Sequence, residues 1–274
     1  RREIRLFWIC SAGHRWKFQF FRRVTLFGVL LSKTKPYFRK FDVLFRGAAA
    51  EFPLFFDASP MPPTPIAPLI NPSAPMRCLD RVQSFVQASA QPSASAVFTR
   101  IDAATALATA EQVDREALQG PLQGWLISLK DNLDVAGQVT TGGSRVCEGD
   151  APAMIDAPVV ARLRAAGAVL VGRTNMTEFA FSGVGINPHH GTPVNPCDAE
   201  VARIPGGSSA GAAVSVAVGL VRAGIGTDTG GSVRIPAALC GLVGFKSSQS
   251  RIPTQGVLEL SRSLDTVGAI TRSV

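Results

Sequence analysis

One stretch of the chain, residues 205–236, decides its fold. It reads PGGSSAG (205–211), then the Ala/Val-rich run AAVSVAVGLVRAGI (212–225), then GTDTGGSVRIP (226–236). Two Gly-Gly-Ser turns therefore flank one short apolar unit and bring Ser208 and Ser232 to the same end of it. Paired glycines admit positive φ angles and let backbone N–H groups gather around a ligand atom. Such loops hold either a phosphate or an oxyanion.

The sequence does not support a phosphate-binding loop here. A P-loop requires Gly-x4-Gly-Lys-Ser/Thr, but no lysine lies between Lys130 and Lys246. A dinucleotide fingerprint requires Gly-x-Gly-x-x-Gly, a spacing that the glycines of this chain never form. The oxyanion interpretation is therefore favoured.

Residues 207–211 also match Gly-x-Ser-x-Gly, the nucleophile elbow of α/β-hydrolases. The elbow needs a histidine base later in the chain, whereas the three histidines are His14, His189 and His190. None of them follows Ser209, so nothing in this sequence supports the elbow.

Lysine is the remaining candidate for a base. Only Lys130 and Lys246 occur after residue 40, and a lysine buried in apolar surroundings loses its proton readily, whereas arginine does not. Lys130 ends the strand-like run 124–130 and is a candidate neutral base. Taken alone, a lysine at a strand end is more often a solvated residue.

Five segments taken together favour a catalytic lysine over a solvated one. They are ISLKDN (127–132), GRTNMTEF (172–179), GTPVNP (191–196) and the two Gly-Gly-Ser loops, and CGLVGFK (240–246) follows them. In this order they resemble the amidase signature family, whose members hydrolyse or transfer amides with a Ser–cis-Ser–Lys triad. The resemblance covers residues 120–274.

The resemblance implies a role for each matching residue. Ser232 is expected to be the nucleophile, Ser208 the bridging serine after a cis peptide bond, and Lys130 the base. Backbone N–H groups are expected to hold the tetrahedral oxyanion, and they belong to Thr229, Gly230, Gly231 and Ser232.

Supporting residues carry weaker expectations. Arg234 either meets a substrate carboxylate or braces the loop through Asp228, and bracing is favoured. Ser209 is expected to add a hydrogen bond or a helix start. Ala210 departs from the family, which usually has glycine there, and its methyl group is expected to tighten the loop. The pair 189–190 lacks partners at ligand spacing, so neither a metal nor a cofactor is expected.

The surrounding pattern predicts an α/β fold, with a mixed β-sheet covered by helices. Predicted helices cover residues 78–87, 103–118, 157–166 and 212–220, and predicted strands 124–130, 168–171 and 221–226. Pro158 suits a first helical turn, and Gly167 follows the last turn.

Charge separates the first 60 residues from the rest. They hold 12 of the 28 Lys and Arg, 4 of the 20 Asp and Glu, and 11 of the 16 Phe, so their formal charge equals the +8 of the whole chain. Such a segment suits a nucleic-acid or membrane-surface arm. The first methionine, Met61, favours another explanation, namely a non-native or mis-started extension. The apolar run 24–31 is too short to span a bilayer.

Two domains are expected: the basic, Phe-rich extension 1–60, and the N-terminal part of an amidase signature domain over 61–274. The family's domain runs well beyond Val274, so the fold is expected to be incomplete at its C-terminus. The five cysteines show no disulfide spacing, which indicates a reducing cytoplasm.

The resemblance implies a cofactor-free enzyme that hydrolyses a small linear amide to an acid and ammonia or an amine. One alternative is the A subunit of a glutamine-dependent tRNA amidotransferase, which uses the same triad with partner subunits. From other classes, the chain is a non-catalytic truncated fragment, or its basic arm binds nucleic acid. The sequence does not specify which amide is the substrate or how many copies assemble.

Overall fold

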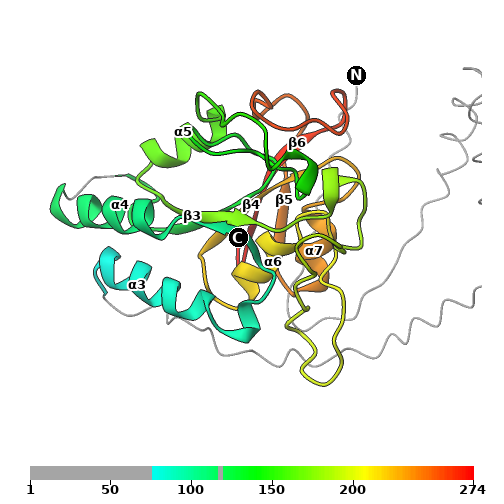
Figure 1. Cartoon of the computed structure of the whole chain (residues 1–274), viewed down its shortest axis with the longest axis horizontal. Helices are drawn as coiled ribbons and strands as arrows, with labels where there is room; N and C mark the ends of the chain where they lie inside the picture. The colour runs from blue at the N-terminus through cyan, green and yellow to red at the C-terminus, as the bar shows by residue number, and fades with distance from the viewer. Residues whose placement is uncertain (1–75, 117–119) are drawn as a thin grey trace, which may run out of the picture. The chain divides into compact units, whose positions relative to one another are not determined.

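The computed structural model describes residues 76–116 and 120–274 (Figure 1). The basic segment 1–60, its charge and Cys10 lie outside the described residues, as do residues 61–75. The proposed division of the chain at residue 60 therefore stays a prediction.

A mixed sheet of six strands forms the centre of the described region, in the order β1-β3-β2-β4-β6-β5. β2 runs parallel to β3 and β4, whereas β1 pairs antiparallel with β3, and β6 with both β4 and β5. The strands are β1 (Phe98–Ile101), β2 (Leu126–Lys130), β3 (Val169–Thr174), β4 (Ala223–Asp228), β5 (Val243–Lys246) and β6 (Thr266–Thr271). The predicted mixed α/β sheet is confirmed.

Helices cover both faces of this sheet. They are α3 (Cys78–Ser89), α4 (Ala103–Glu116), α5 (Pro158–Ala165), α6 (Ala210–Ala217) and α7 (Arg234–Leu239), with short 3-10 turns at Pro92–Ala94, Arg145–Cys147 and Glu178–Ala180. α3, α4, α6 and α7 contribute to one apolar cluster, and α5 contributes to the other. The sheet is thus the middle layer of three.

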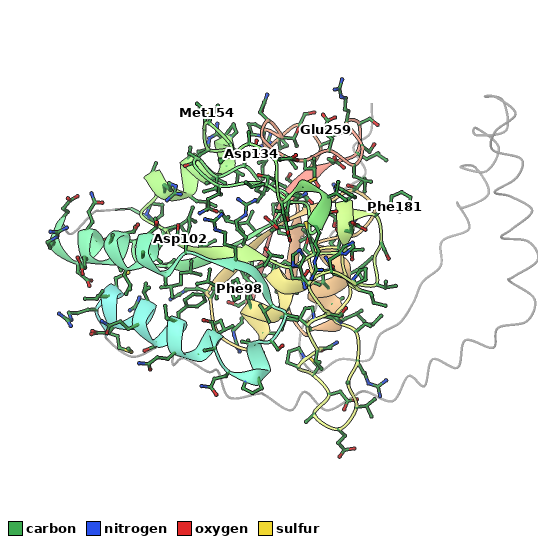
Figure 2. The ribbon with its side chains drawn as sticks, viewed as in Figure 1. Phe98, Asp102, Asp134, Met154, Phe181 and Glu259 are labelled. Atoms are coloured by element: carbon green, nitrogen blue, oxygen red, sulfur yellow. The ribbon has the colours of Figure 1, made fainter. Side chains whose placement is uncertain are left out.

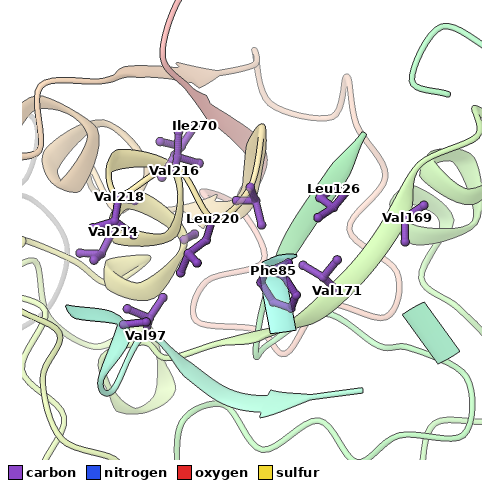
Figure 3. Packing of buried hydrophobic residues seen from close by; sticks show 14 of the residues in the cluster. Phe85, Val97, Leu126, Val169, Val171, Val214, Val216, Val218, Leu220 and Ile270 are labelled. Atoms are coloured by element: carbon purple, nitrogen blue, oxygen red, sulfur yellow. The ribbon is translucent and has the colours of Figure 1, made fainter. Parts of the chain in front are cut away.

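The larger cluster packs α3, α4 and α6 against one face of the sheet (Figure 3). Phe85 of α3 is fully buried and meets the ring of Phe98 edge-on, with the ring centroids 5.5 Å apart. Val169 and Val171 of β3 and Leu126 of β2 face the same cluster. The opposite face of the sheet carries Ile127 and Leu129 in a second cluster with Val160 of α5.

The predicted elements around residues 205–236 are present, but their boundaries differ. The helix predicted over 212–220 is α6, which begins at Ala210 and ends at Ala217, because Gly219 has a φ of +77° and closes the turn. The strand predicted over 221–226 is β4, which begins two residues later, at Ala223, and ends two residues later, at Asp228. Strand β3 extends three residues beyond the prediction, to Thr174. α3, α4 and α5 lie where helices were predicted.

Four elements were not predicted: β1, β5, β6 and α7. β1 and β5 have four residues each, which is too short for a clear periodic signal. α7 is a six-residue helix that contains Pro236, a residue that usually argues against a helix. None of the helices in the described residues is both long and apolar enough to cross a membrane.

Candidate active site

The site residues come together because β2 and β4 are parallel neighbours. Their carboxyl ends lie at the same edge of the sheet, where α/β proteins commonly place their sites. β2 ends at Lys130, and β4 ends at Asp228. The two Gly-Gly-Ser loops reach this edge from the start of α6 and the start of α7.

Lys130 is fully buried and held by two hydroxyl groups. Its Nζ lies 2.7 Å from Ser208 Oγ and 2.8 Å from Thr227 Oγ1, with the Thr227 carbonyl oxygen at 3.4 Å. Burial lowers the pKa of Lys130 to about 7, although the carboxylates of Asp228 and Asp265 act in the opposite direction. The side chain expected to be a neutral base thus lies in surroundings that favour its neutral form.

The Gly207–Ser208 peptide bond is cis, as the family resemblance implies. A side chain at Gly207 would place its Cβ 2.7 Å from backbone atoms of Gly185, so only glycine fits there. The Ser208 carbonyl oxygen accepts a 3.1 Å hydrogen bond from the Thr177 amide. The backbone around Ser208 is therefore held in place by Gly185 and Thr177, and in this position the Ser208 hydroxyl contacts the Lys130 amine.

Ser232 stands at the start of α7 with 7% of its surface exposed. Its carbonyl oxygen accepts a 3.2 Å hydrogen bond from the Ser209 amide, which ties the two Gly-Gly-Ser loops together. Ser209 in turn donates its hydroxyl to the Thr227 carbonyl oxygen, at 3.3 Å. Across residues 76–116 and 120–274, no hydrogen bond joins the hydroxyls of Ser208 and Ser232. The structure brings Lys130 and Ser208 into direct contact and links Ser232 to them through the backbone.

Asp228 organises the loop that carries Ser232. Its fully buried carboxylate accepts hydrogen bonds from the amides of Gly231 and Val233, at 2.8 and 3.1 Å. Arg234 binds the same carboxylate through Nε and Nη2, both at 2.9 Å. Burial raises the pKa of Asp228, but the contacts from Arg234 and Val233 outweigh it and lower that pKa overall. Arg234 thus makes the bracing contact that the sequence favoured.

This arrangement divides the four amides expected to hold an oxyanion. The Gly231 amide is already donated to Asp228. The amides of Gly230 and Ser232 donate to no group within the described part of the chain, so both can meet a ligand. The Thr229 amide likewise donates to no group in the described residues, and the Thr229 hydroxyl donates to the carboxylate of Asp265.

Three residues at this site were missed by sequence reasoning. Thr227 Oγ1 lies within hydrogen-bond distance of both Lys130 Nζ and Asn132 Nδ2, the latter at 3.0 Å. Asp265 binds Thr229 and the amides of Leu260 and Ser261. Asn132 lies inside a segment quoted for the resemblance, and its position two residues after Lys130 was a usable signal. Asp265 lies outside every quoted segment and offered none.

His189 belongs to a separate polar cluster. Its Nε2 lies 3.0 Å from Glu178 Oε1, and the same oxygen accepts a 2.7 Å hydrogen bond from the Ser144 hydroxyl. No group of three His, Cys, Asp or Glu side chains that could hold a metal ion occurs in the described residues.

The family model named Amidase matches residues 80–274. The A subunit of glutamyl-tRNA(Gln) amidotransferase from Methanosarcina mazei is 43% identical over 169 residues, covering 62% of this chain and 35% of that protein. Amidase 1 of Oryza sativa subsp. japonica is 46% identical over 157 residues, covering 57% of this chain and 36% of that protein.

The fold has solved counterparts as well. The native peptide amidase of Stenotrophomonas maltophilia superimposes with a TM-score of 0.64 and 34% identity, covering 72% of this chain and 42% of that structure. The chain spans about a third of the length of the curated relatives that it matches.

Proposed function

The chain belongs to the amidase signature family, and from that premise we propose that it hydrolyses a linear carboxylic amide through an acyl-enzyme on Ser232. The observation that carries the proposal is the 2.7 Å contact between the buried Lys130 amine and the Ser208 hydroxyl. A lysine with a pKa of about 7 has a large neutral fraction at physiological pH, and a neutral amine can accept a hydroxyl proton.

In the proposed reaction, Lys130 takes the proton of Ser208 while Ser208 takes the proton of Ser232. The Ser232 oxygen then forms a bond to the carbonyl carbon of the amide. This step requires the hydroxyls of Ser208 and Ser232 to approach one another when substrate is bound. Catalytic hydrogen bonds commonly shorten in the substrate complex, so the separation of the two hydroxyls is compatible with the step.

We propose that the amides of Gly230 and Ser232 hold the oxyanion of the tetrahedral intermediate. Losing one such donor typically costs about 3–4 kcal/mol of transition-state stabilisation. The relay returns a proton to the departing nitrogen as the carbon–nitrogen bond breaks. Water, deprotonated through the same relay, then attacks the ester on Ser232 and releases the acid. These steps need no metal or cofactor, and the proposal assigns none.

Intact-mass analysis after treatment with a fluorophosphonate tests this proposal. We expect one adduct on the 274-residue chain, no adduct on Ser232→Ala, and at least a hundredfold slower labelling of Lys130→Ala, since general-base assistance contributes about 10²–10⁴-fold.

Ser248→Ala and Lys246→Ala are the matched controls, because Ser248 is exposed and Lys246 is the only other lysine after residue 40. Both are expected to label like the parent chain. Equal labelling of Ser232→Ala and the parent would refute the assignment.

A second candidate function is that of the A subunit of a tRNA-dependent amidotransferase, which releases ammonia from glutamine with the same triad. The similarity to the A subunit of glutamyl-tRNA(Gln) amidotransferase favours it, although Amidase 1 is comparably similar. Glutaminase activity that appears only with partner subunits and tRNA would distinguish this function from a stand-alone amidase. If no fluorophosphonate labels the chain under any of these conditions, the chain would instead be a non-catalytic fragment.

We propose a reducing cytoplasm as the compartment. Four cysteines in the described residues, Cys78, Cys147, Cys197 and Cys240, are free thiols. Burial raises the pKa of Cys78 to about 11, so its thiol stays protonated near neutral pH. Fractionation of cells that express the tagged chain would test this placement.

A further inference from the structure

Asp265 stands beside the loop that carries Ser232 because of the register of β4 and β6. The two strands run antiparallel, and Asp228, the last residue of β4, pairs with Thr266, the first residue of β6. One step further along the chain from each strand end lie Thr229 and Asp265, so the same register places these two side chains opposite one another. The Thr266 hydroxyl also donates to the Asp228 carbonyl oxygen, at 2.8 Å. The start of β6 therefore holds the loop at the point where it leaves the sheet.

The carboxylate of Asp265 joins two loops. Its Oδ1 accepts a hydrogen bond from the Thr229 hydroxyl. Its Oδ2 accepts hydrogen bonds from the amides of Leu260 and Ser261, at 2.9 and 3.0 Å. Both amides belong to the loop before β6, where Glu259 is labelled in Figure 2. Only 7% of Asp265 is exposed, and a buried carboxylate that is hydrogen-bonded at both oxygens restrains the groups that it joins.

The segment between Thr229 and Ser232 needs such a restraint. It consists of Gly230 and Gly231, and glycine has the greatest backbone freedom of all residues. Gly230 is exposed, and within the described residues nothing lies within 4 Å of the Cβ that another residue would have there. Because packing does not hold Gly230, its position depends on the residues on either side of it.

Two buried carboxylates hold the loop on the two sides of Gly230. Asp265 holds the preceding residue, Thr229, through its hydroxyl. Asp228 holds the following residue, Gly231, through its amide, at 2.8 Å. Neither contact uses the Gly230 amide, which therefore stays available to a ligand.

Asp265 also acts on Lys130 through its charge. Burial has the largest effect on the pKa of Lys130 and lowers it to about 7, whereas the carboxylates of Asp228 and Asp265 both raise it. The effect of Asp228 is the larger of the two. The pH dependence of the proposed base therefore reports the charge of Asp265 separately from its hydrogen bonds.

We propose that Asp265 is a positioning residue for the reaction: through the Thr229 hydroxyl it fixes the start of the glycine turn, so that the amides of Gly230 and Ser232 point towards one oxyanion. Donors that are aligned in advance with the developing charge need no reorganisation during the reaction. This role rests on the proposed amidase function, which assigns these amides to the tetrahedral intermediate. The competing account is that Asp265 only closes the loop before β6, and it predicts no effect of the Thr229 hydroxyl.

The rate of fluorophosphonate labelling at Ser232, followed by intact mass on the full chain, tests this role. Thr229→Val keeps the shape of the side chain but removes the hydroxyl. We expect its labelling to slow about tenfold, less than the roughly hundredfold or more that deletion of one donor causes, with the midpoint of the pH profile unchanged. Thr229→Ser keeps a hydroxyl and is expected to recover most of that loss. Asp265→Asn is expected to slow labelling by a similar factor and to move the midpoint below that of the parent, because a negative charge that acts on Lys130 is lost.

Thr105→Val and Asp150→Asn are the matched controls, because Thr105 on α4 and Asp150 after the turn 145–147 are both exposed. Both variants are expected to label like the parent chain. Equal labelling of Thr229→Val and the parent would overturn the proposal. A Thr229→Ser chain as slow as Thr229→Val would overturn it as well, since the hydroxyl would then not be the group that matters.

Hydrogen–deuterium exchange of the peptide that spans residues 229–233 distinguishes a failure of this role from a failure of the proposed function. If the parent chain does not label, the proposed function fails, but the exchange measurement still tests the anchoring. Faster exchange in Thr229→Val than in the parent and Thr229→Ser would support anchoring by Asp265. Equal exchange in all three chains would overturn it.

Discussion

In the proposed mechanism, Lys130 can act as a base only when its amine is unprotonated, and burial brings that condition close to neutral pH. Because its pKa is lowered to about 7, the rate of Ser232 labelling by a fluorophosphonate is expected to rise with pH and level off above that value. Lys246→Ala should show the same profile as the parent chain. A rate that keeps rising towards the ordinary lysine pKa of 10.5 would show that Lys130 is not the titrating base.

Asp228 has two effects on the site, and two measurements on one variant can distinguish them. Its negative charge raises the pKa of Lys130, and its oxygens anchor the amides of the Ser232 loop. In Asp228→Asn we expect the midpoint of the pH profile to move below that of the parent. We also expect labelling to slow about a hundredfold, because the proposed oxyanion donors would lose their alignment.

The matched control for this prediction is Asp150→Asn, since Asp150 is exposed and makes no contact with the loop. It should leave both the midpoint and the rate unchanged. If Asp228→Asn moved the midpoint upward, the electrostatic account of Lys130 would be wrong.

At the scale of residues, the sequence predicted the site side chains that belong to the family's characteristic segments as triad or loop residues. It missed other side chains that reach the site only through the fold. Lys130 and Ser208 were predicted as partners and lie 2.7 Å apart. Their catalytic roles, and that of Ser232, stay predictions. Thr227 was not predicted, because a threonine in a strand is ordinary and only the register of β2 on β4 places it on Lys130.

At the scale of elements, helix α6 depends on a close approach at its first turn. A Cβ on Gly211 would lie 2.2 Å from the Val97 carbonyl oxygen and 2.7 Å from the Asn175 amide nitrogen. Gly211→Ala must therefore push α6 away from two neighbouring segments. We expect a loss of stability of at least about 1–3 kcal/mol, the usual cost of overpacking. Urea denaturation followed by circular dichroism measures it.

Gly149→Ala is the control for this change, because nothing lies within 4 Å of a Cβ at that position. Its unfolding midpoint should match the parent within error. If Gly211→Ala were equally harmless, the contact between α6 and the segment around Asn175 would have to be looser than the structure has it.

The same scale explains which elements the sequence could predict. α5 was predicted with its first turn and its end, since Pro158 and Gly167 are local signals. Strand β6 carries little such signal, because its TVGAIT sequence is short and contains a glycine. Its place beside β4 follows from long-range pairing, for example of Ile225 with Ala269, which no local pattern encodes.

At the scale of the whole molecule, the positive charge and the candidate active site belong to different parts of the chain. Every contact described at the site lies within residues 76–274, whereas residues 1–60 carry a formal charge equal to the +8 of the chain. Deletion of residues 1–60 is expected to leave Ser232 labelling and the urea midpoint unchanged. It should also abolish any salt-sensitive binding to RNA or DNA. Slower labelling of the shortened chain would contradict this independence.

The pairing of β2 with β4 also affects the order in which parts of the molecule fold. Lys130 and Thr227 meet across 97 positions of sequence, whereas α3 and α4 are near neighbours along the chain. Contacts that close long loops form late in folding, because the chain loses the conformational entropy of loop closure before the contacts contribute any stabilising free energy. During refolding from urea, far-UV circular dichroism should therefore recover before the capacity of Ser232 to react with a fluorophosphonate. Simultaneous recovery of both signals would mean that the central parallel strands pair as early as the local helices.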